Sequence, residues 1–374
     1  MTALNAARTA PDSGLIVAIV IVPGGEVGHH MNFISDNAYG AARPILDALT
    51  AANSGAVPAY GDDSLSGRLQ RRFSEVFARD VAIFPVVTGT AANCLALATL
   101  VPPHGAIFCH EAAHIEDDEC GAPEFFTHGA KLVRVGGAGG KLTPAILEAA
   151  LARFRPGDVH QVQPAAISIT QATEAGTCYR PDEIAALARL AHARGMKLHM
   201  DGARFANAVA FLDVAPAELA WRAGVDVLSF GAAKGGALVA EAVVFFDPKL
   251  AGDFVYRRKK AGHLLSKMRF VSAQLDAYLT DGLWLSLAGR ANALAQVLAD
   301  GLAHLPGASL AHPVEANEIF VWLPDAVVAR LRAEGAQFYD WARPDNNRTL
   351  IRLVTSFATE ENDVGRLLAI ARGK

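Results

Sequence analysis

The chain has 374 residues and a formal net charge of −4, with 52% hydrophobic and 19% charged residues. This balance excludes a mainly disordered chain and argues against a general nucleic-acid binder. The length predicts two domains, or one large α/β domain with an appendage. The four cysteines form no CxxC pair, which is typical of a reducing compartment, so we expect a cytoplasmic protein with free thiols.

Residues 1–30 are interpreted as an N-terminal extension without an assigned role. Their longest apolar run, Leu15 to Val22, is shorter than the ~20 residues of a membrane span. The residues around this run do not fit a signal peptide. We therefore expect no membrane association, and Met31 is a plausible alternative start.

Short apolar runs alternate with helical periodicity from about residue 66 onward. Helices are expected over 69–77, 91–100, 144–154 and 181–194, and strands over 81–87, 106–109, 131–135, 165–170, 196–200, 225–230 and 242–246. Strands that alternate with helices of this length predict an α/β fold, in which a large, mostly parallel sheet has helices on both faces.

The pattern changes after residue 250. A basic stretch at 257–260 precedes two long helical segments over 261–305, and short strands follow at 318–323 and 349–354. We therefore predict a large α/β domain over 31–250 and a small C-terminal α+β domain over 251–374.

Three segments that follow strands carry the candidate chemistry. Asp201 ends a strand, and ligands of open α/β sheets bind outside the carboxyl ends of their strands. An equally good interpretation is that Asp201 caps the next helix. Lys234 also follows a strand, among glycines and alanines with no acid nearby in the sequence. Such an amine would be partly desolvated and suited to Schiff-base formation, whereas most loop lysines are simply exposed.

The third segment, Thr88-Gly89-Thr90, lies between a strand and a helix. A helix N-terminus with hydroxyl groups can bind a phosphate, although a threonine there also caps a helix without any ligand. Together, the phosphate seat, the aspartate and the lysine match what pyridoxal 5'-phosphate needs from a protein.

The sequence resembles the threonine aldolase family of fold-type-I pyridoxal-phosphate enzymes, within the β-eliminating lyase group. The resemblance runs from about residue 32 to the C-terminus. Its motifs, in the family's order, lie at 33–37, 60–63, 88–93, 112–114, 199–204, 234–235 and 351–355.

The resemblance implies roles for individual residues. It implies that Lys234 binds the cofactor covalently and that Asp201 pairs with its pyridine nitrogen. It implies that Gly89 and Thr90 bind the phosphate and that His114 stacks on the ring.

Further implied residues surround the substrate. Ser35, Arg204 and Arg352 are implied to bind the amino-acid carboxylate, and Arg204 also the cofactor. Tyr60 is implied to contact substrate, and Lys259 and Lys267 the cofactor, in the site of a neighbouring subunit.

The implied activity is cleavage of L-threonine and L-allo-threonine to glycine and acetaldehyde, in threonine catabolism and glycine biosynthesis, by a dimer of dimers. Another fold-type-I enzyme, such as a β-eliminating lyase or an aminotransferase, and a pyridoxal-phosphate-binding protein without turnover remain alternatives. The chain departs from many family members at Ala233, Glu174 and Ser356. These departures concern the preference for the β-substituent.

His110 to His114 matches the HExxH motif of zinc proteases, in which both histidines share one helix face. Here His110 directly follows an expected strand, and no third ligand follows downstream. We predict no metal site and interpret His110 as a loop residue near the mouth of the site. His114, with His128 and Glu119 as rivals, is the candidate base for the substrate hydroxyl.

Overall fold

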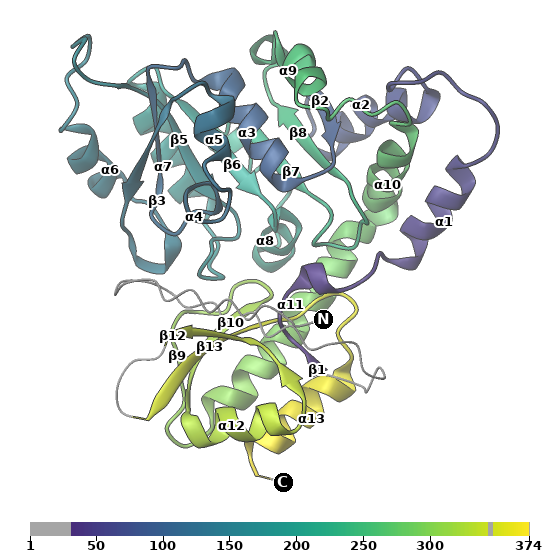
Figure 1. The fold of residues 1–374 in the computed structure, drawn as a ribbon, viewed down its shortest axis with the longest axis vertical. Helices are drawn as coiled ribbons and strands as arrows, with labels where there is room; N and C mark the ends of the chain where they lie inside the picture. The colour runs from purple at the N-terminus through teal and green to yellow at the C-terminus, as the bar shows by residue number, and fades with distance from the viewer. Residues whose placement is uncertain (1–30, 343–346, 374) are drawn as a thin grey trace, which may run out of the picture.

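The computed structural model describes residues 31–342 and 347–373, so the predicted N-terminal extension lies outside the described residues. Figure 1 shows a large domain with a central sheet above a smaller domain with its own sheet. Within the described residues no helix is long and apolar enough to cross a membrane.

The large sheet has seven strands in the order β2-β8-β7-β6-β5-β3-β4. Strands β7, β6, β5, β3 and β4 are parallel, whereas β8 is antiparallel to both its neighbours. In chain order the strands are β2 Ala82–Val86, β3 Gly105–His110, β4 Lys131–Val135, β5 Gln163–Thr170, β6 Lys197–Gly202, β7 Val227–Gly231 and β8 Glu241–Phe245.

Helices cover both faces of this sheet. Alternate strand residues point to opposite faces, so Leu228 packs into the core on one face and Val227 into the core on the other. The helices of this domain are α1 Arg43–Ala52, α2 Ser64–Val76, α3 Gly89–Leu100, α4 His114–Asp117, α5 Ala122–Phe126, α6 Pro144–Leu151, α7 Pro181–His192, α8 Phe205–Leu212, α9 Phe254–Lys260 and α10 Arg269–Leu279. The predicted α/β fold is confirmed.

The small domain contains an antiparallel four-stranded sheet in the order β12-β13-β10-β9. Its strands are β9 Ser309–Leu310, β10 Glu318–Pro324, β12 Tyr339–Ala342 and β13 Arg348–Val354, and its helices are α11 Leu283–Ala303, α12 Asp325–Ala333 and α13 Glu361–Ala371. A separate pair joins β1 (Met31–Asn32) in parallel to β11 (Ala336–Gln337). Short 3-10 turns lie at Asp36–Ala38, Ala138–Gly140, Trp221–Ala223, Pro248–Ala251 and Thr280–Gly282.

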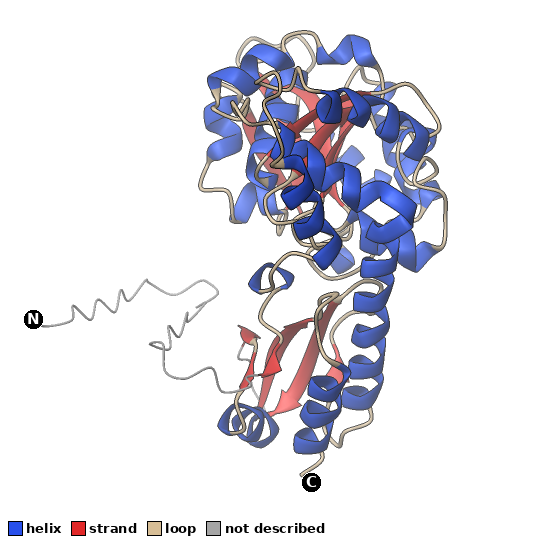
Figure 2. Cartoon of the chain, turned by 90° about the vertical axis from the view of Figure 1, so that its right-hand side faces the viewer, coloured by secondary structure: helices blue, strands red, loops and turns tan. Residues whose placement is uncertain are grey.

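Helix α11 belongs to both hydrophobic cores and runs from the large domain down beside the small sheet (Figure 2). Trp284 and Ala288 pack with the large domain, whereas Leu294 and Leu298 pack with the small one. The change from one core to the other therefore lies inside α11, later in the chain than the predicted boundary near residue 250. The reason is that α9 and α10, which follow that boundary, pack on the large domain.

Candidate functional site

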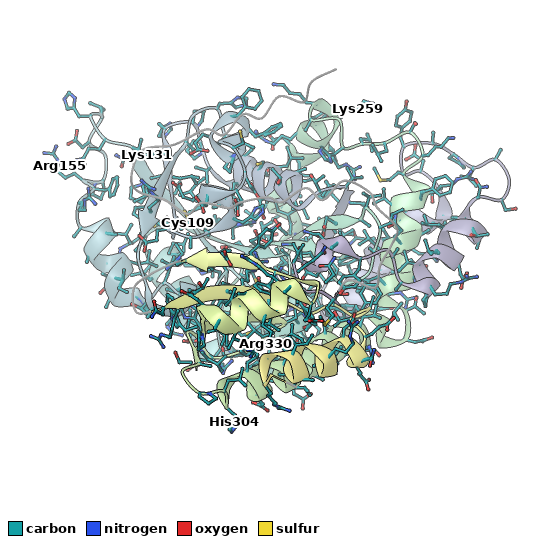
Figure 3. All side chains as sticks on the ribbon, turned by 60° about the horizontal axis from the view of Figure 1, so that its bottom comes forward. Cys109, Lys131, Arg155, Lys259, His304 and Arg330 are labelled. Atoms are coloured by element: carbon teal, nitrogen blue, oxygen red, sulfur yellow. The ribbon has the colours of Figure 1, made fainter. Side chains whose placement is uncertain are left out.

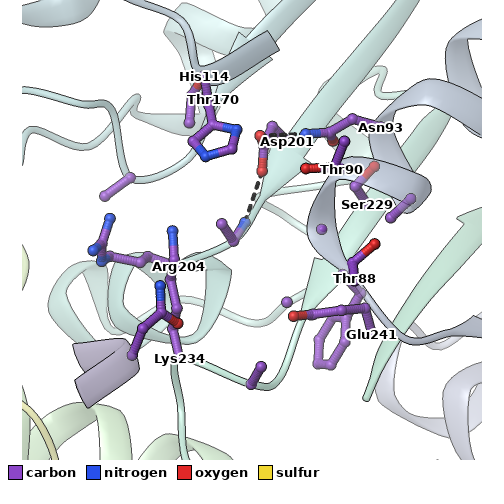
Figure 4. Close-up of a pocket in the computed structure, with 18 of the residues that line it drawn as sticks. Thr88, Thr90, Asn93, His114, Thr170, Asp201, Arg204, Ser229, Lys234 and Glu241 are labelled. Carbon is purple, nitrogen blue, oxygen red and sulfur yellow. Dashed lines mark hydrogen bonds between the residues drawn. The ribbon is translucent and has the colours of Figure 1, made fainter. Parts of the chain in front are cut away.

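A pocket of about 320 Å³ opens at the carboxyl ends of three neighbouring strands of the large sheet. Thr170 ends β5, Asp201 is the last residue but one of β6, and Gly231 ends β7. All three line the pocket, because parallel strands bring their carboxyl ends to the same edge of a sheet. In Figure 4 the side chains of Lys234, His114, Asp201 and Arg204 surround one space.

The N-terminus of α3 forms one wall of the pocket. Thr88 caps the helix by accepting a hydrogen bond from the backbone N–H of Ala91 at 3.2 Å. Gly89 and Thr90, the next two residues, line the pocket. The first backbone N–H groups of a helix have no partner within the helix, and the helix dipole favours an anion there. This wall is therefore suited to a phosphate group.

Asp201 and His114 belong to one buried hydrogen-bond network. The Asn93 side-chain amide donates to Asp201 Oδ2 at 2.7 Å and to Glu119 Oε1 at 3.0 Å. Glu119 Oε1 in turn lies 2.8 Å from His114 Nδ1. The backbone N–H of Ala203 donates to Asp201 Oδ1 at 3.0 Å. The carboxylate of Asp201 is thus fixed on both oxygens, and the network extends from it to the imidazole.

His114 is fixed by its contact with Glu119 on one side of the ring and lines the pocket on the other. The hydrogen bond that His114 Nδ1–H donates to the Glu119 carboxylate raises the pKa of His114 above its ordinary value, and burial only partly opposes this. A protonated imidazole donates hydrogen bonds but does not accept protons. Glu119, predicted as a rival base, is buried beside Asn93 and does not line the pocket. It acts on His114 rather than on a ligand.

Lys234 follows β7 and lines the pocket. The buried carboxyl of Glu241, from the start of β8, interacts electrostatically with Lys234. Glu241 Oε2 also accepts a hydrogen bond from the backbone N–H of Ala232 at 2.7 Å, which fixes the loop. A side chain at Gly235 would collide with the hydroxyl of Tyr278. These contacts define the path of the backbone at the lysine.

The two arginines predicted to bind a carboxylate come together between the domains. Arg204 forms two hydrogen bonds with Asp36, at 2.8 and 3.0 Å, and lines the pocket, whereas Arg352 lies behind it and does not line the pocket. Glu318 lies between the arginines, 3.0 Å from Arg204 Nη1 and 3.2 Å from Arg352 Nη2. Ser35, also predicted here, caps the short turn after it by accepting from the N–H of Asn37. Asn37, rather than Ser35, lines the pocket.

Glu174 lines the pocket and has no predicted role. Its Oε1 accepts hydrogen bonds from the Thr170 hydroxyl at 2.7 Å and from the backbone N–H of His114 at 2.9 Å. Its Oε2 is enclosed and has no hydrogen-bond partner among the described residues. Burial raises the pKa of this carboxyl to about 7. The only sign of Glu174 in the sequence was that many members of the family have a different residue at this position.

Tyr60, Lys259 and Lys267 do not line the pocket of their own chain. Lys259 lies over the Tyr60 ring, 4.6 Å from its centroid, and Figure 3 shows Lys259 at the outer edge of the large domain. Their predicted contribution to a neighbouring subunit's site remains a prediction.

The other predicted histidines lie away from the reacting centre. His110 is a buried strand residue that ends β3, with Nε2 at 3.0 Å from the carbonyl oxygen of Gly137, so its interpretation as a loop residue is wrong. It does not share a helix with His114, which begins α4. His128 is exposed and does not line the pocket, so it is not a base for a ligand bound there.

The sheet topology and the pocket at its carboxyl edge define the class of protein. The fold is that of the fold-type-I pyridoxal-phosphate enzymes. A threonine aldolase from Leishmania major has the same fold, with a TM-score of 0.87 and 29% identity over 91% of this chain and 98% of that one. A serine palmitoyltransferase from Sphingomonas wittichii, 16% identical with a TM-score of 0.65, shares the fold alone.

The chain belongs to the beta-eliminating lyase family, whose sequence model matches residues 32–326. A low specificity L-threonine aldolase from a Pseudomonas species is 47% identical over 91% of this chain and 96% of that protein. The protein of the same name from Pseudomonas aeruginosa is 45% identical over 92% of this chain and 97% of that protein. The predicted resemblance to threonine aldolases is confirmed.

Proposed function

We propose that this chain is a low-specificity L-threonine aldolase, which cleaves L-threonine and L-allo-threonine to glycine and acetaldehyde. The observation that carries the proposal is the convergence of Lys234, Asp201, His114 and the N-terminus of α3 on one pocket. The two Pseudomonas relatives that bear this name support it, because they match almost the whole chain.

The residues of the pocket fit pyridoxal 5'-phosphate. Gly89 and Thr90 would hold its phosphate, Asp201 its pyridine nitrogen, and Lys234 its aldehyde carbon. The His114 ring would stack on it. When bound, the cofactor supplies an electron-withdrawing ring that makes bonds at the substrate Cα easier to break.

The protein's own residues then orient the substrate and move one proton. Arg204 and Arg352 bind the α-carboxylate. The Thr170 hydroxyl accepts the proton of the β-hydroxyl as it passes its own proton to Glu174. The Cα–Cβ bond breaks, the β-oxygen becomes the aldehyde oxygen, and the bonding pair stays with the glycine fragment. Cα then takes a proton from solvent, which completes glycine.

Glu174 suits the final acceptor role better than His114. A base works best when its pKa lies near the working pH, and burial raises the pKa of Glu174 to about 7. The pKa of His114 is raised by Glu119, which favours the protonated form. We therefore assign the acceptor role to Glu174 and stacking on the cofactor ring to His114.

The proposal extends to the assembly and the cell. We propose a cytoplasmic homotetramer, a dimer of dimers, that serves threonine catabolism and glycine biosynthesis. In it Tyr60, Lys259 and Lys267 would reach the neighbouring subunit's site. Their position outside the pocket of their own chain is compatible with this role.

The test is to incubate the purified protein, loaded with pyridoxal phosphate, with L-threonine and to measure glycine and acetaldehyde. Lys234→Ala should abolish turnover and the visible absorbance of the bound cofactor, whereas the exposed control Lys249→Ala should change neither. Pyruvate and ammonia from L-serine would indicate β-elimination, and transfer of the amino group to an oxo acid would indicate an aminotransferase. Cofactor binding without turnover of any amino acid would indicate a non-catalytic binder.

A further inference from the structure

Glu318 is a buried carboxylate beside the two arginines to which the proposed reaction assigns the α-carboxylate of the substrate. It begins β10 in the small sheet and is 3% exposed. Its Oε2 lies 3.0 Å from Arg204 Nη1, and its Oε1 lies 3.2 Å from Arg352 Nη2. One carboxylate thus spans the two arginines that we assign to the α-carboxylate of the substrate.

The charges of this cluster are balanced before any ligand binds. Arg204 is already paired through two hydrogen bonds with Asp36. With Glu318, the two guanidinium groups therefore face two carboxylates. An incoming α-carboxylate would bring a third negative charge to two positive ones. Like charges in a buried site repel strongly, because the low local dielectric does not screen them.

The hydrogen bonds of the cluster, in contrast, are incomplete. Glu318 Oε2 and Arg352 Nε are both enclosed and have no hydrogen-bond partner among the described residues. The contact of Glu318 Oε2 with Arg204 is close, but it lacks the alignment of a hydrogen bond. Buried polar groups are nearly always satisfied in native proteins. A free guanidinium N–H beside a poorly aligned carboxylate therefore indicates a place for a second acceptor.

We propose that Glu318 is a specificity-determining residue, whose carboxylate competes with the α-carboxylate of the substrate for Arg204 and Arg352. The inference rests on the proposed function. When a substrate binds, either Glu318 turns away from Arg352 or it stays and repels the ligand. Both outcomes lower the affinity of the pocket for amino acids with a free carboxylate, and neither changes the chemistry at Cβ.

The test compares Glu318→Gln with Glu315→Gln in the cofactor-loaded protein. The glutamine keeps the shape of the side chain and removes its charge. Glu315 is a matched control three residues earlier, because it is paired at 2.8 Å with Arg180, whereas Glu318 is paired with Arg204 and Arg352. We expect Glu318→Gln to lower the KM for L-threonine by roughly tenfold or more, from the loss of one close repulsion, with kcat changed less than about twofold.

A binding measurement gives a second readout that does not depend on turnover. Calorimetric titration should show that Glu318→Gln binds glycine roughly tenfold tighter than the parent does, the direction expected when a like charge is removed. Glycinamide, which has no carboxylate, should gain no affinity. Glu315→Gln should match the parent with both ligands.

Several outcomes would overturn the inference. One is a KM that is unchanged or higher in Glu318→Gln while the parent cleaves threonine. Another is an equal gain in affinity for glycine and glycinamide. Glu318→Met, apolar and of similar length, repeats the test if the glutamine variant does not fold. If neither uncharged variant folds, the charge serves stability and the inference is wrong. A parent that binds glycine but cleaves no threonine would refute the proposed function and leave the titration as the test of Glu318.

Discussion

Asp36 and Arg204 form a two-point ion pair although 168 positions separate them in the sequence. Asp36 is buried in the turn that leads from β1 into the large domain, and Arg204 follows β6 at the edge of the pocket. The side-chain amide of Asn317, from the segment before β10, also donates to Asp36 at 3.0 Å. One carboxylate thus joins three distant segments and sets the direction of the Arg204 guanidinium.

We expect Asp36→Asn to destabilise the protein by ~3–5 kcal/mol, because it removes one of the two carboxylates paired with the buried Arg204, the one that holds it through two hydrogen bonds. The KM for L-threonine should rise as well, since Arg204 loses its fixed direction. Urea unfolding and steady-state kinetics measure the two effects. The control is Asp47→Asn, in an exposed pair with Arg43. Equal unfolding free energies in both variants would contradict the prediction.

Replacing Glu119 should change the titration of His114. The hydrogen bond that His114 donates to the Glu119 carboxylate raises the pKa of His114, so Glu119→Gln should lower that pKa. NMR titration of the histidine ring in the cofactor-free protein measures the shift. Glu116→Gln is the matched control, because Glu116 lies on the same short helix as His114 but pairs with Arg134. An unchanged His114 pKa in the Glu119 variant would show that the 2.8 Å contact does not control the ring.

The pH profile of threonine cleavage tests the role of Glu174. Burial, with a smaller contribution from Asp201, raises its pKa to about 7, and Arg204 lies close enough to interact with it. Only the ionised carboxylate accepts a proton, so the rate should rise as pH increases through about 7. Glu174→Gln should lower kcat by ~10²–10⁴-fold and remove this rise, while exchange of the glycine α-proton with solvent continues.

Two substitutions at Thr170 control that experiment. Thr170→Ser keeps a hydroxyl beside Glu174 and should keep most of the activity. Thr170→Val removes the hydroxyl that donates to Glu174 at 2.7 Å and should reproduce much of the loss. Full activity in the valine variant would exclude a proton relay through this residue.

Glu241 should make the stability of the cofactor-free protein depend on pH. Burial raises its pKa from 4.5 to about 7, so the folded state holds a proton that the unfolded state releases. Stability is therefore lost as pH rises from 4.5 to about 7, by about 3 kcal/mol from this group. The free energy of unfolding, measured with urea, should differ between pH 5 and pH 8. Glu241→Gln should remove the part of this difference that Glu241 contributes. Glu218 is half-exposed, and Glu218→Gln should leave the pH dependence of the unfolding free energy unchanged. An identical pH dependence in both variants would refute the prediction.

The sequence predicted the strands and the residues at their ends well, for a physical reason. Lys234 and Asp201 each follow a run of apolar residues that is long enough for a strand but not for a helix. In a parallel sheet such strand ends meet at one edge, so local patterns sufficed to bring these two residues together. The N-terminus of α3 was predicted in the same way from Thr88-Gly89-Thr90.

The residues that the sequence left without a role are those whose environment is made by distant segments. Glu174 lies in a loop, and its enclosure comes from Thr170 and from the backbone of His114. Glu318 has the pattern of an ordinary strand residue until the small sheet brings it between two arginines. No local periodicity reports such contacts, because His114 reaches Glu174 from another part of the large domain and Arg204 reaches Glu318 from the other domain.

The small domain's core is built from two separate parts of the chain. Met31 and Phe33 pack with residues 294–371, and β1 pairs with β11. The chain therefore passes between the two cores twice, once after Phe33 and once inside α11. With two connections, the simplest relative motion of the domains would be a hinge rotation about the line that joins them. Because Arg352 and Glu318 lie on the small sheet, such a rotation would move both of them as a unit toward or away from Lys234.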